Sequence, residues 1–167
     1  MANVQRARSG TMCDIAQRIR SAYVSVITYE KPQTDDQDMH SLWGGHSAVT
    51  RSKLLEILER ADGGCEDFSM ADRILFTACE FWAAVEAGTL KAFLGTTALQ
   101  QLRCSAFAYK AIGAAEVARE LEVALRVLSL ADTSHGRTEC IESLQDRLRS
   151  SAAPTGDLID KFSQLVH

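Results

Sequence analysis

The distribution of proline constrains the fold of this chain more than any other feature. The 167 residues contain only two prolines, Pro32 and Pro154, and the 121 residues between them contain none. Proline is the strongest helix breaker, whereas alanine and leucine, which occur 23 and 17 times, are among the best helix formers. The sequence therefore predicts an all-α fold.

Apolar residues recur at steps of three and four along most of the chain, as they do in helices that bury one face. The first such segment covers about residues 11 to 29. Thr50 is the expected cap of a second helix, and Ser69 with Asp72 forms a capping-box pattern before the most apolar segment, which Gly88 ends. Further helices are expected at about residues 89–94, after Thr96 or Thr97, from Ala114 to Ala131, after Gly136 and after Pro154.

These segments predict one compact, bundle-like domain of about seven or eight helices over residues 1–167. A chain of this length buries roughly two thirds of the surface that its unfolded form exposes. We expect a flexible N-terminus at residues 1–10 and an irregular segment at residues 31–49, which is rich in Asp, Gln, Gly and His.

The sequence shows neither an export signal nor a membrane-spanning run. No apolar stretch follows the basic residues at the N-terminus, and no span approaches about eighteen consecutive apolar residues. The five cysteines are an odd number without a C-x-x-C pair, which is typical of reduced thiols. We therefore expect a cytoplasmic protein.

The net charge of −4 conceals an uneven distribution. Residues 56–86 hold eight acids and two bases, a balance of −6, while the rest of the chain holds 14 acids and 16 bases, a balance of +2. Such a segment is either a solvated helix surface or a face that attracts basic proteins and repels nucleic acid. The candidate partner-binding residues are Glu56, Glu59, Asp62, Glu66, Asp67, Asp72, Glu80 and Glu86.

Trp43 is the candidate apolar anchor of such a surface. It stands beside Gly44 and Gly45 in the irregular segment. A tryptophan in a loop either covers the edge of the core or, when exposed, anchors a binding partner.

An enzymatic interpretation uses the histidines. His40, His46 or His135 would then meet a cysteine or aspartate, with Cys140 and His135 as a nucleophile and its base. No H-E-x-x-H, C-x-x-C or phosphate-binding glycine pattern is present, so we expect no metal and no cofactor. Cys140 also neighbours an inward-facing isoleucine, which favours a structural thiol.

The stretch from Arg73 to Leu128 resembles the domain typified by the bacterial DNA-mimic proteins. The similarity follows the order of an aromatic, apolar helix, a hydrophobic turn near a glycine, an Ala-Ile-Gly-Ala sequence and a helix rich in Ala, Glu and Leu. Where the family usually has an Asn-Gly-Gly-aromatic turn, this chain has Ala-Gly-Thr-Leu at residues 87–90. The resemblance implies an all-helical protein whose carboxylates stand in for DNA phosphates.

Together these features predict a non-enzymatic inhibitor that occupies a basic protein partner through an acidic helical surface. It would act as a DNA mimic on a DNA-binding protein, or as an immunity protein on a toxin enzyme. Neither nucleic acid nor membrane is an expected direct partner. The alternatives are a small hydrolase or metal-dependent enzyme that uses the loop histidines, and a structural helical subunit that would show an extended apolar patch.

Overall fold

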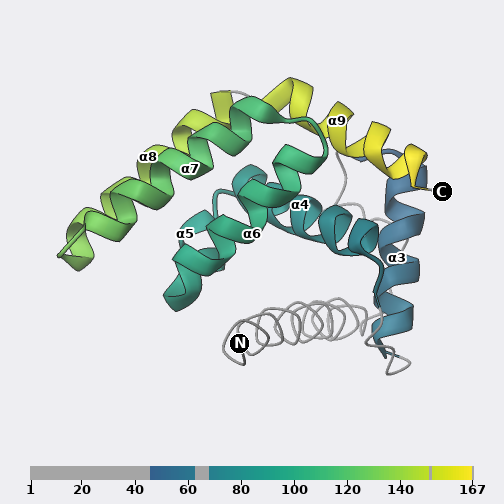
Figure 1. The fold of residues 1–167 in the computed structure, drawn as a ribbon, viewed down its shortest axis with the longest axis horizontal. Coiled ribbons are helices and arrows are strands. Elements are labelled where there is room, and N and C mark those ends of the chain that lie inside the picture. The colour runs from purple at the N-terminus through teal and green to yellow at the C-terminus, as the bar shows by residue number, and fades with distance from the viewer. Residues whose placement is uncertain (1–45, 63–67, 151, 167) are drawn as a thin grey trace, which may run out of the picture.

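The computed structural model describes residues 46–62, 68–150 and 152–166 (Figure 1). All regular elements in these ranges are helical, which confirms the predicted all-α class for this part of the chain. The helix expected at residues 11–29 and most of the segment 31–49 lie outside the described residues. The elements are α3 (Ala48–Asp62), α4 (Met70–Ala87), α5 (Leu90–Leu94), a 3-10 turn η1 (Gly95–Thr97), α6 (Ala98–Ala111), α7 (Ala115–Leu130), α8 (Ser134–Ser150) and α9 (Ala152–Leu165).

Helix α4 has the two ends that the sequence predicted. The Ser69 hydroxyl accepts the backbone N–H of Asp72, and the Asp72 carboxylate accepts the backbone N–H of Ser69, which completes a capping box. At the other end Gly88 adopts a left-handed conformation with φ of 75°. Such a conformation is unfavourable for residues with a Cβ atom, so a glycine at this place ends the helix.

Helix α3 begins earlier than the sequence predicted. The expected cap was Thr50, but the helix starts at Ala48, and the Ser47 hydroxyl accepts the backbone N–H of Thr50 at 3.3 Å. The Thr50 hydroxyl instead donates to Asp160 of α9 at 2.7 Å. Thr50 is therefore a tertiary contact within the first turn, and the prediction of its capping role was wrong.

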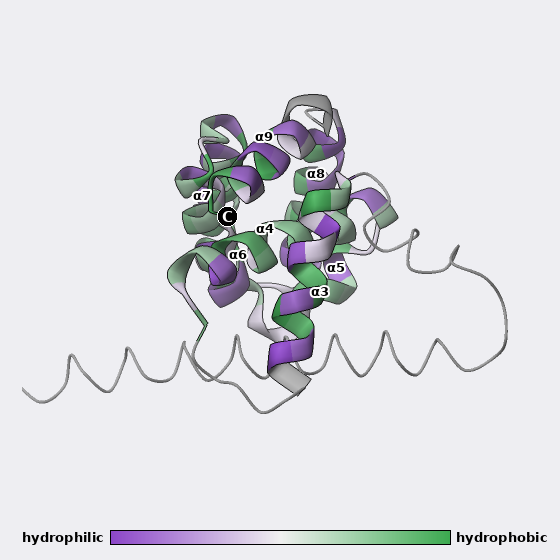
Figure 2. Ribbon diagram, turned by 90° about the vertical axis from the view of Figure 1, so that its right-hand side faces the viewer, coloured by the Kyte–Doolittle hydropathy of each residue, from purple (hydrophilic) through white to green (hydrophobic). Residues whose placement is uncertain are grey.

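Helix α4 is the centre of the packing, as expected from its apolar face. It contacts α3, α5, α6, α8 and α9. Figure 1 shows α7 and α8 side by side along one edge of the molecule, with α9 continuing beyond α8 to meet α3. In Figure 2 the helices carry both hydrophilic and hydrophobic residues, as helices with one buried face do.

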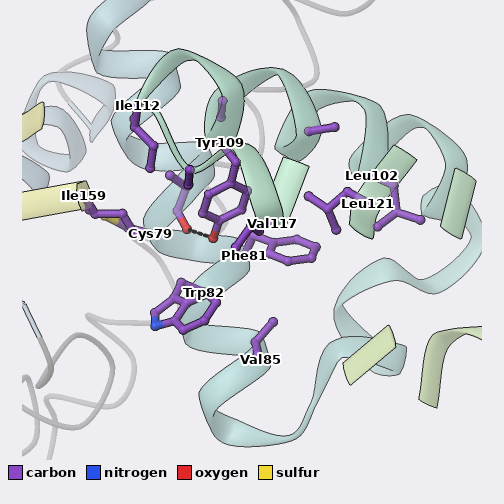
Figure 3. Packing of buried hydrophobic residues seen from close by; sticks show 14 of the residues in the cluster. Cys79, Phe81, Trp82, Val85, Leu102, Tyr109, Ile112, Val117, Leu121 and Ile159 are labelled. Atoms are coloured by element: carbon purple, nitrogen blue, oxygen red, sulfur yellow. Dashed lines mark hydrogen bonds between the residues drawn. The ribbon is translucent and has the colours of Figure 1, made fainter. Parts of the chain in front are cut away.

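Aromatic side chains of α4 and α6 fill the middle of the core (Figure 3). The Tyr109 ring meets the Phe81 and Trp82 rings edge-on, at centroid distances of 5.7 and 6.5 Å. Its hydroxyl donates to the backbone carbonyl of Ala78 at 2.9 Å, so the buried polar end is satisfied. Met70, at the start of α4, lies outside this core and is 62% exposed.

Within the described ranges, the helices are too short or too polar to cross a membrane.

Candidate protein-binding surface

Two of the predicted acidic binding residues are exposed on α3. Glu56 and Glu59 lie one turn apart on its outer side, where residues three apart have Cβ atoms about 5 to 6 Å from each other. The side chains of Leu54, Ile57 and Leu58 are at most 1% exposed. Because these apolar residues fix the helix in the core, the two carboxylates project from a rigid element.

A lysine contacts this acidic pair. Lys53 Nζ lies 3.1 Å from a carboxylate oxygen of Glu56, one turn earlier on the helix. The Glu56 side chain is 47% exposed, whereas the Lys53 side chain is only 13% exposed. Lys53 therefore offsets part of the negative charge that Glu56 presents to solvent.

Asp72 is not part of an exposed surface, although the sequence placed it in the acidic face. Its side chain is buried, with one carboxylate oxygen 2.6 Å from the Arg60 guanidinium and 3.1 Å from the backbone nitrogen of Ser69. Burial by itself would raise the pKa of Asp72, but the hydrogen bonds from Arg60 and Ser69 outweigh it and lower the pKa below its ordinary value. Asp72 therefore joins α3 to α4 and is not available to a basic partner.

Of the three acidic residues of α4, Glu86 is the exposed one. Glu86 is exposed at the C-terminal end of α4, where its carboxylate accepts the indole N–H of Trp82 at 3.0 Å. Glu80 is half-buried on the same helix. Among the described acids of residues 56–86, the exposed ones are therefore Glu56 and Glu59 on α3 and Glu86 at the far end of α4.

The remaining candidates lie outside the described residues. They are Trp43, Glu66, Asp67 and the side chain of Asp62, whose backbone ends α3. Their place in a binding surface stays a prediction.

The histidines proposed for an enzymatic site have separate surroundings. His135 is exposed on α8, with Nε2 3.0 Å from the carboxylate of Glu139, and His46 is buried directly before α3. His40 lies outside the described residues. Over the described ranges, no three side chains of His, Cys, Asp or Glu are arranged to hold a metal ion.

Cys140 has the surroundings of a structural thiol. It is half-buried on α8, and its Sγ lies 3.9 Å from the backbone carbonyl oxygen of Ala124 on α7. Burial raises the pKa of the Cys140 thiol, although the nearby Arg147 acts in the opposite direction. A raised pKa lowers the thiolate fraction, and the thiolate is the nucleophilic form.

Asp160 organises the start of α3, a role that no sequence pattern indicates. One Asp160 oxygen accepts the backbone N–H of Ser47 at 2.9 Å, and the other accepts the hydroxyl of Thr50 at 2.7 Å. Ser47 and Thr50 are each more than 100 residues away from Asp160 in the chain, so no local sequence pattern could have revealed the contact. Asp160 connects α9 to the N-terminal turn of α3.

His46 lies against the same carboxylate. Its Nδ1 is 3.5 Å from an Asp160 oxygen and has no hydrogen-bond partner among the described residues, although the side chain is only 4% exposed. Burial lowers the pKa of His46, while the charges of Asp160 and Glu86 raise it and that of Arg51 lowers it. The net pKa is below the ordinary value, so the imidazole is neutral near pH 7.

Comparison of the chain with protein-family models, with curated proteins and with solved structures finds no match.

Proposed function

We propose that this chain is a non-enzymatic protein that binds a basic protein partner through the exposed carboxylates of Glu56 and Glu59. The observation that carries the proposal is their position on α3. Both side chains face solvent, while the neighbouring Leu54, Ile57 and Leu58 are completely enclosed by the core. Because the backbone of α3 is held in the core, only the two side chains need ordering on binding, which favours affinity.

The spacing of the pair suits a basic surface that binds nucleic acid. Charges three residues apart on a helix are about 5 to 6 Å apart, a separation comparable to that of successive phosphates along a DNA strand. A DNA-binding protein or a nuclease toxin offers lysines and arginines at matching places. We therefore propose a DNA-binding protein or a toxin enzyme as the partner, bound by an acidic patch on α3 that excludes Asp72 because this residue is buried.

Such a surface acts mainly on the rate of encounter. Complementary charges accelerate association, and salt screens the effect over a distance of about 10 Å at 0.1 M ionic strength. Bound partners identified by affinity purification from the native cell should therefore elute with rising salt. Retention that is insensitive to salt would point to a different kind of surface.

Charge reversal tests the assignment to these two residues. The double variant Glu56→Lys, Glu59→Lys should slow association with the purified partner at least tenfold at low salt. The control is Glu139→Lys, Asp146→Lys, which changes the net charge equally on the exposed side of α8. If both double variants slow association alike, only the net charge matters and the α3 site is wrong.

A further inference from the structure

A second surface of opposite character lies on α6. Residues 87–115 contain no Asp or Glu, although the whole chain has 22 of them, and their three bases are Lys91, Arg103 and Lys110. Two of these bases, Arg103 and Lys110, belong to α6 and are exposed. The helix therefore presents positive charge with no acid of its own.

An aromatic residue lies between the two cations on the same helix face. Arg103, Phe107 and Lys110 are spaced four and three residues apart, which aligns them along one side of a helix. Phe107 is 58% exposed, whereas Leu102 and Tyr109 on the other side of α6 are fully buried. Phe107 thus contributes little to the core.

Neither cation is paired with an acid in the described part of the chain. Over these ranges no ion pair joins Arg103 or Lys110 to a carboxylate. By contrast, Arg60 is bound to Asp72 and Arg147 to Glu120. The two exposed positive charges on either side of Phe107 can therefore meet an external anionic group.

We propose that the Arg103, Phe107 and Lys110 face of α6 docks an acidic amphipathic helix of a partner protein. Seven residues of helix span about 10 Å, so a second helix can set two carboxylates against the cations and an apolar side chain against Phe107. This face is on a different helix from Glu56 and Glu59, and the inference does not depend on the proposed function.

The small size of the basic surface favours a protein helix over a nucleic acid or a membrane. Arg103 and Lys110 are two cations, whereas nucleic-acid binding uses a longer basic patch or stripe. Membrane surfaces are bound by helices with a broad apolar face and many basic residues, and here one aromatic ring is exposed between two cations. An acidic helix needs only the three contacts that α6 offers.

The chain contains a matched control for this surface on α7. Arg119, Val123 and Arg126 repeat the same spacing of two exposed cations around an exposed apolar residue. The α7 set has a valine where the α6 set has a phenylalanine. In addition, α7 carries the exposed acids Glu116 and Glu122, whereas α6 has no acid. If binding depends only on general electrostatic attraction, charge reversal in either set should weaken it. If the α6 face is a specific site, only the α6 variants should weaken binding.

The test uses the full chain and a fluorescein-labelled, alanine-based helical peptide that carries Glu, Leu and Glu at positions i, i+4 and i+7. Fluorescence anisotropy should show saturable binding at 50 mM salt. The double variant Arg103→Glu, Lys110→Glu and, separately, Phe107→Ser should each weaken binding at least tenfold. The double variant Arg119→Glu, Arg126→Glu and the single variant Val123→Ser should change it less than twofold.

Three results would overturn the proposal. One is absence of saturable peptide binding by a wild-type chain that is folded by circular dichroism. Another is equal weakening by the α6 and α7 variants. The third is tighter binding of a single-stranded oligonucleotide or of anionic phosphatidylserine vesicles than of the peptide. Because Phe107 is exposed, the Phe107→Ser variant should keep the fold and so remain informative.

Discussion

Gln145 and Leu90 are joined by a buried hydrogen bond between α8 and the start of α5. The backbone N–H of Leu90 donates to Oε1 of Gln145 at 3.2 Å, and Nε2 of the same side chain donates to the Val85 carbonyl at 3.3 Å. Helix ends leave such backbone groups without partners inside the helix. The Gln145 side chain therefore makes a hydrogen bond to the backbone on each side of the break between α4 and α5.

Replacing this glutamine should destabilise the fold. Gln145→Ala leaves a buried N–H and a buried carbonyl with fewer partners, which costs about 2 kcal/mol of unfolding free energy. Urea denaturation followed by circular dichroism measures the loss. Gln164→Ala, at an exposed position of α9, is the control and should change stability by less than about 0.5 kcal/mol. Equal effects of the two variants would show that the bridge is unimportant.

Asp72→Ala should also lower stability near pH 7, by about 2 kcal/mol, because it removes the carboxylate that accepts the backbone N–H of Ser69 in the capping box of α4 and that pairs with Arg60. The folded pKa of Asp72 is below its ordinary value of 3.8. Its stabilising contribution is therefore present above that value and is lost as the pH falls through the folded pKa. The difference from wild type should shrink below about pH 4 in urea titrations, and a constant difference would contradict the pairing.

His46 should make the fold sensitive to mild acid. Because burial lowers its pKa from the ordinary value of 6.5, protons bind the unfolded chain more readily than the folded one. Neutral His46 therefore makes its full contribution to the free energy of unfolding above pH 6.5, and this contribution declines as the pH falls through the folded pKa of His46. Between pH 7.5 and pH 5.5, His46→Gln should lose less unfolding free energy than wild type. His135→Gln, at an exposed site, should retain the wild-type loss.

Replacement of two glycines by alanine should change the stability of the fold in opposite directions. Gly88 has a φ of 75°, and an added Cβ would lie 2.7 Å from the guanidinium of Arg149, so Gly88→Ala should cost about 1 to 2 kcal/mol. Gly156 lies in α9 without a positive φ and with open space where a Cβ would stand, so Gly156→Ala should stabilise by about 0.5 to 1 kcal/mol. Thermal unfolding measures both effects, and equal signs would contradict these backbone assignments.

Local patterns in the sequence predicted the ends of α4 correctly. The capping box of Ser69 with Asp72 and the left-handed Gly88 depend on neighbours within a few residues. The same local logic was wrong for Gly136, which was expected to precede α8 but lies within its first turn. A single glycine costs a helix only about 1 kcal/mol, so the packing of Ile141, Leu144 and Leu148 decides where the helix runs.

The candidate surface was harder to predict because it depends on tertiary partners. Counting acids placed Asp72 beside Glu56 and Glu59, but the contact of Arg60 with Asp72 forms only when α3 packs on α4. The role of Asp160 could not be predicted because its partners, Ser47 and Thr50, lie more than 100 residues away in the chain. Periodicity identifies which helix faces are apolar, but it does not identify which charges pair across helices.

The salt dependence of partner association tests the central claim most directly. The association rate constant of the wild-type chain with its purified partner should fall at least tenfold between 50 and 300 mM salt, since screening weakens steering by Glu56 and Glu59. The Glu56→Lys, Glu59→Lys variant should associate slowly at both concentrations, with little salt dependence. A wild-type rate constant that is unchanged across this range would contradict the account.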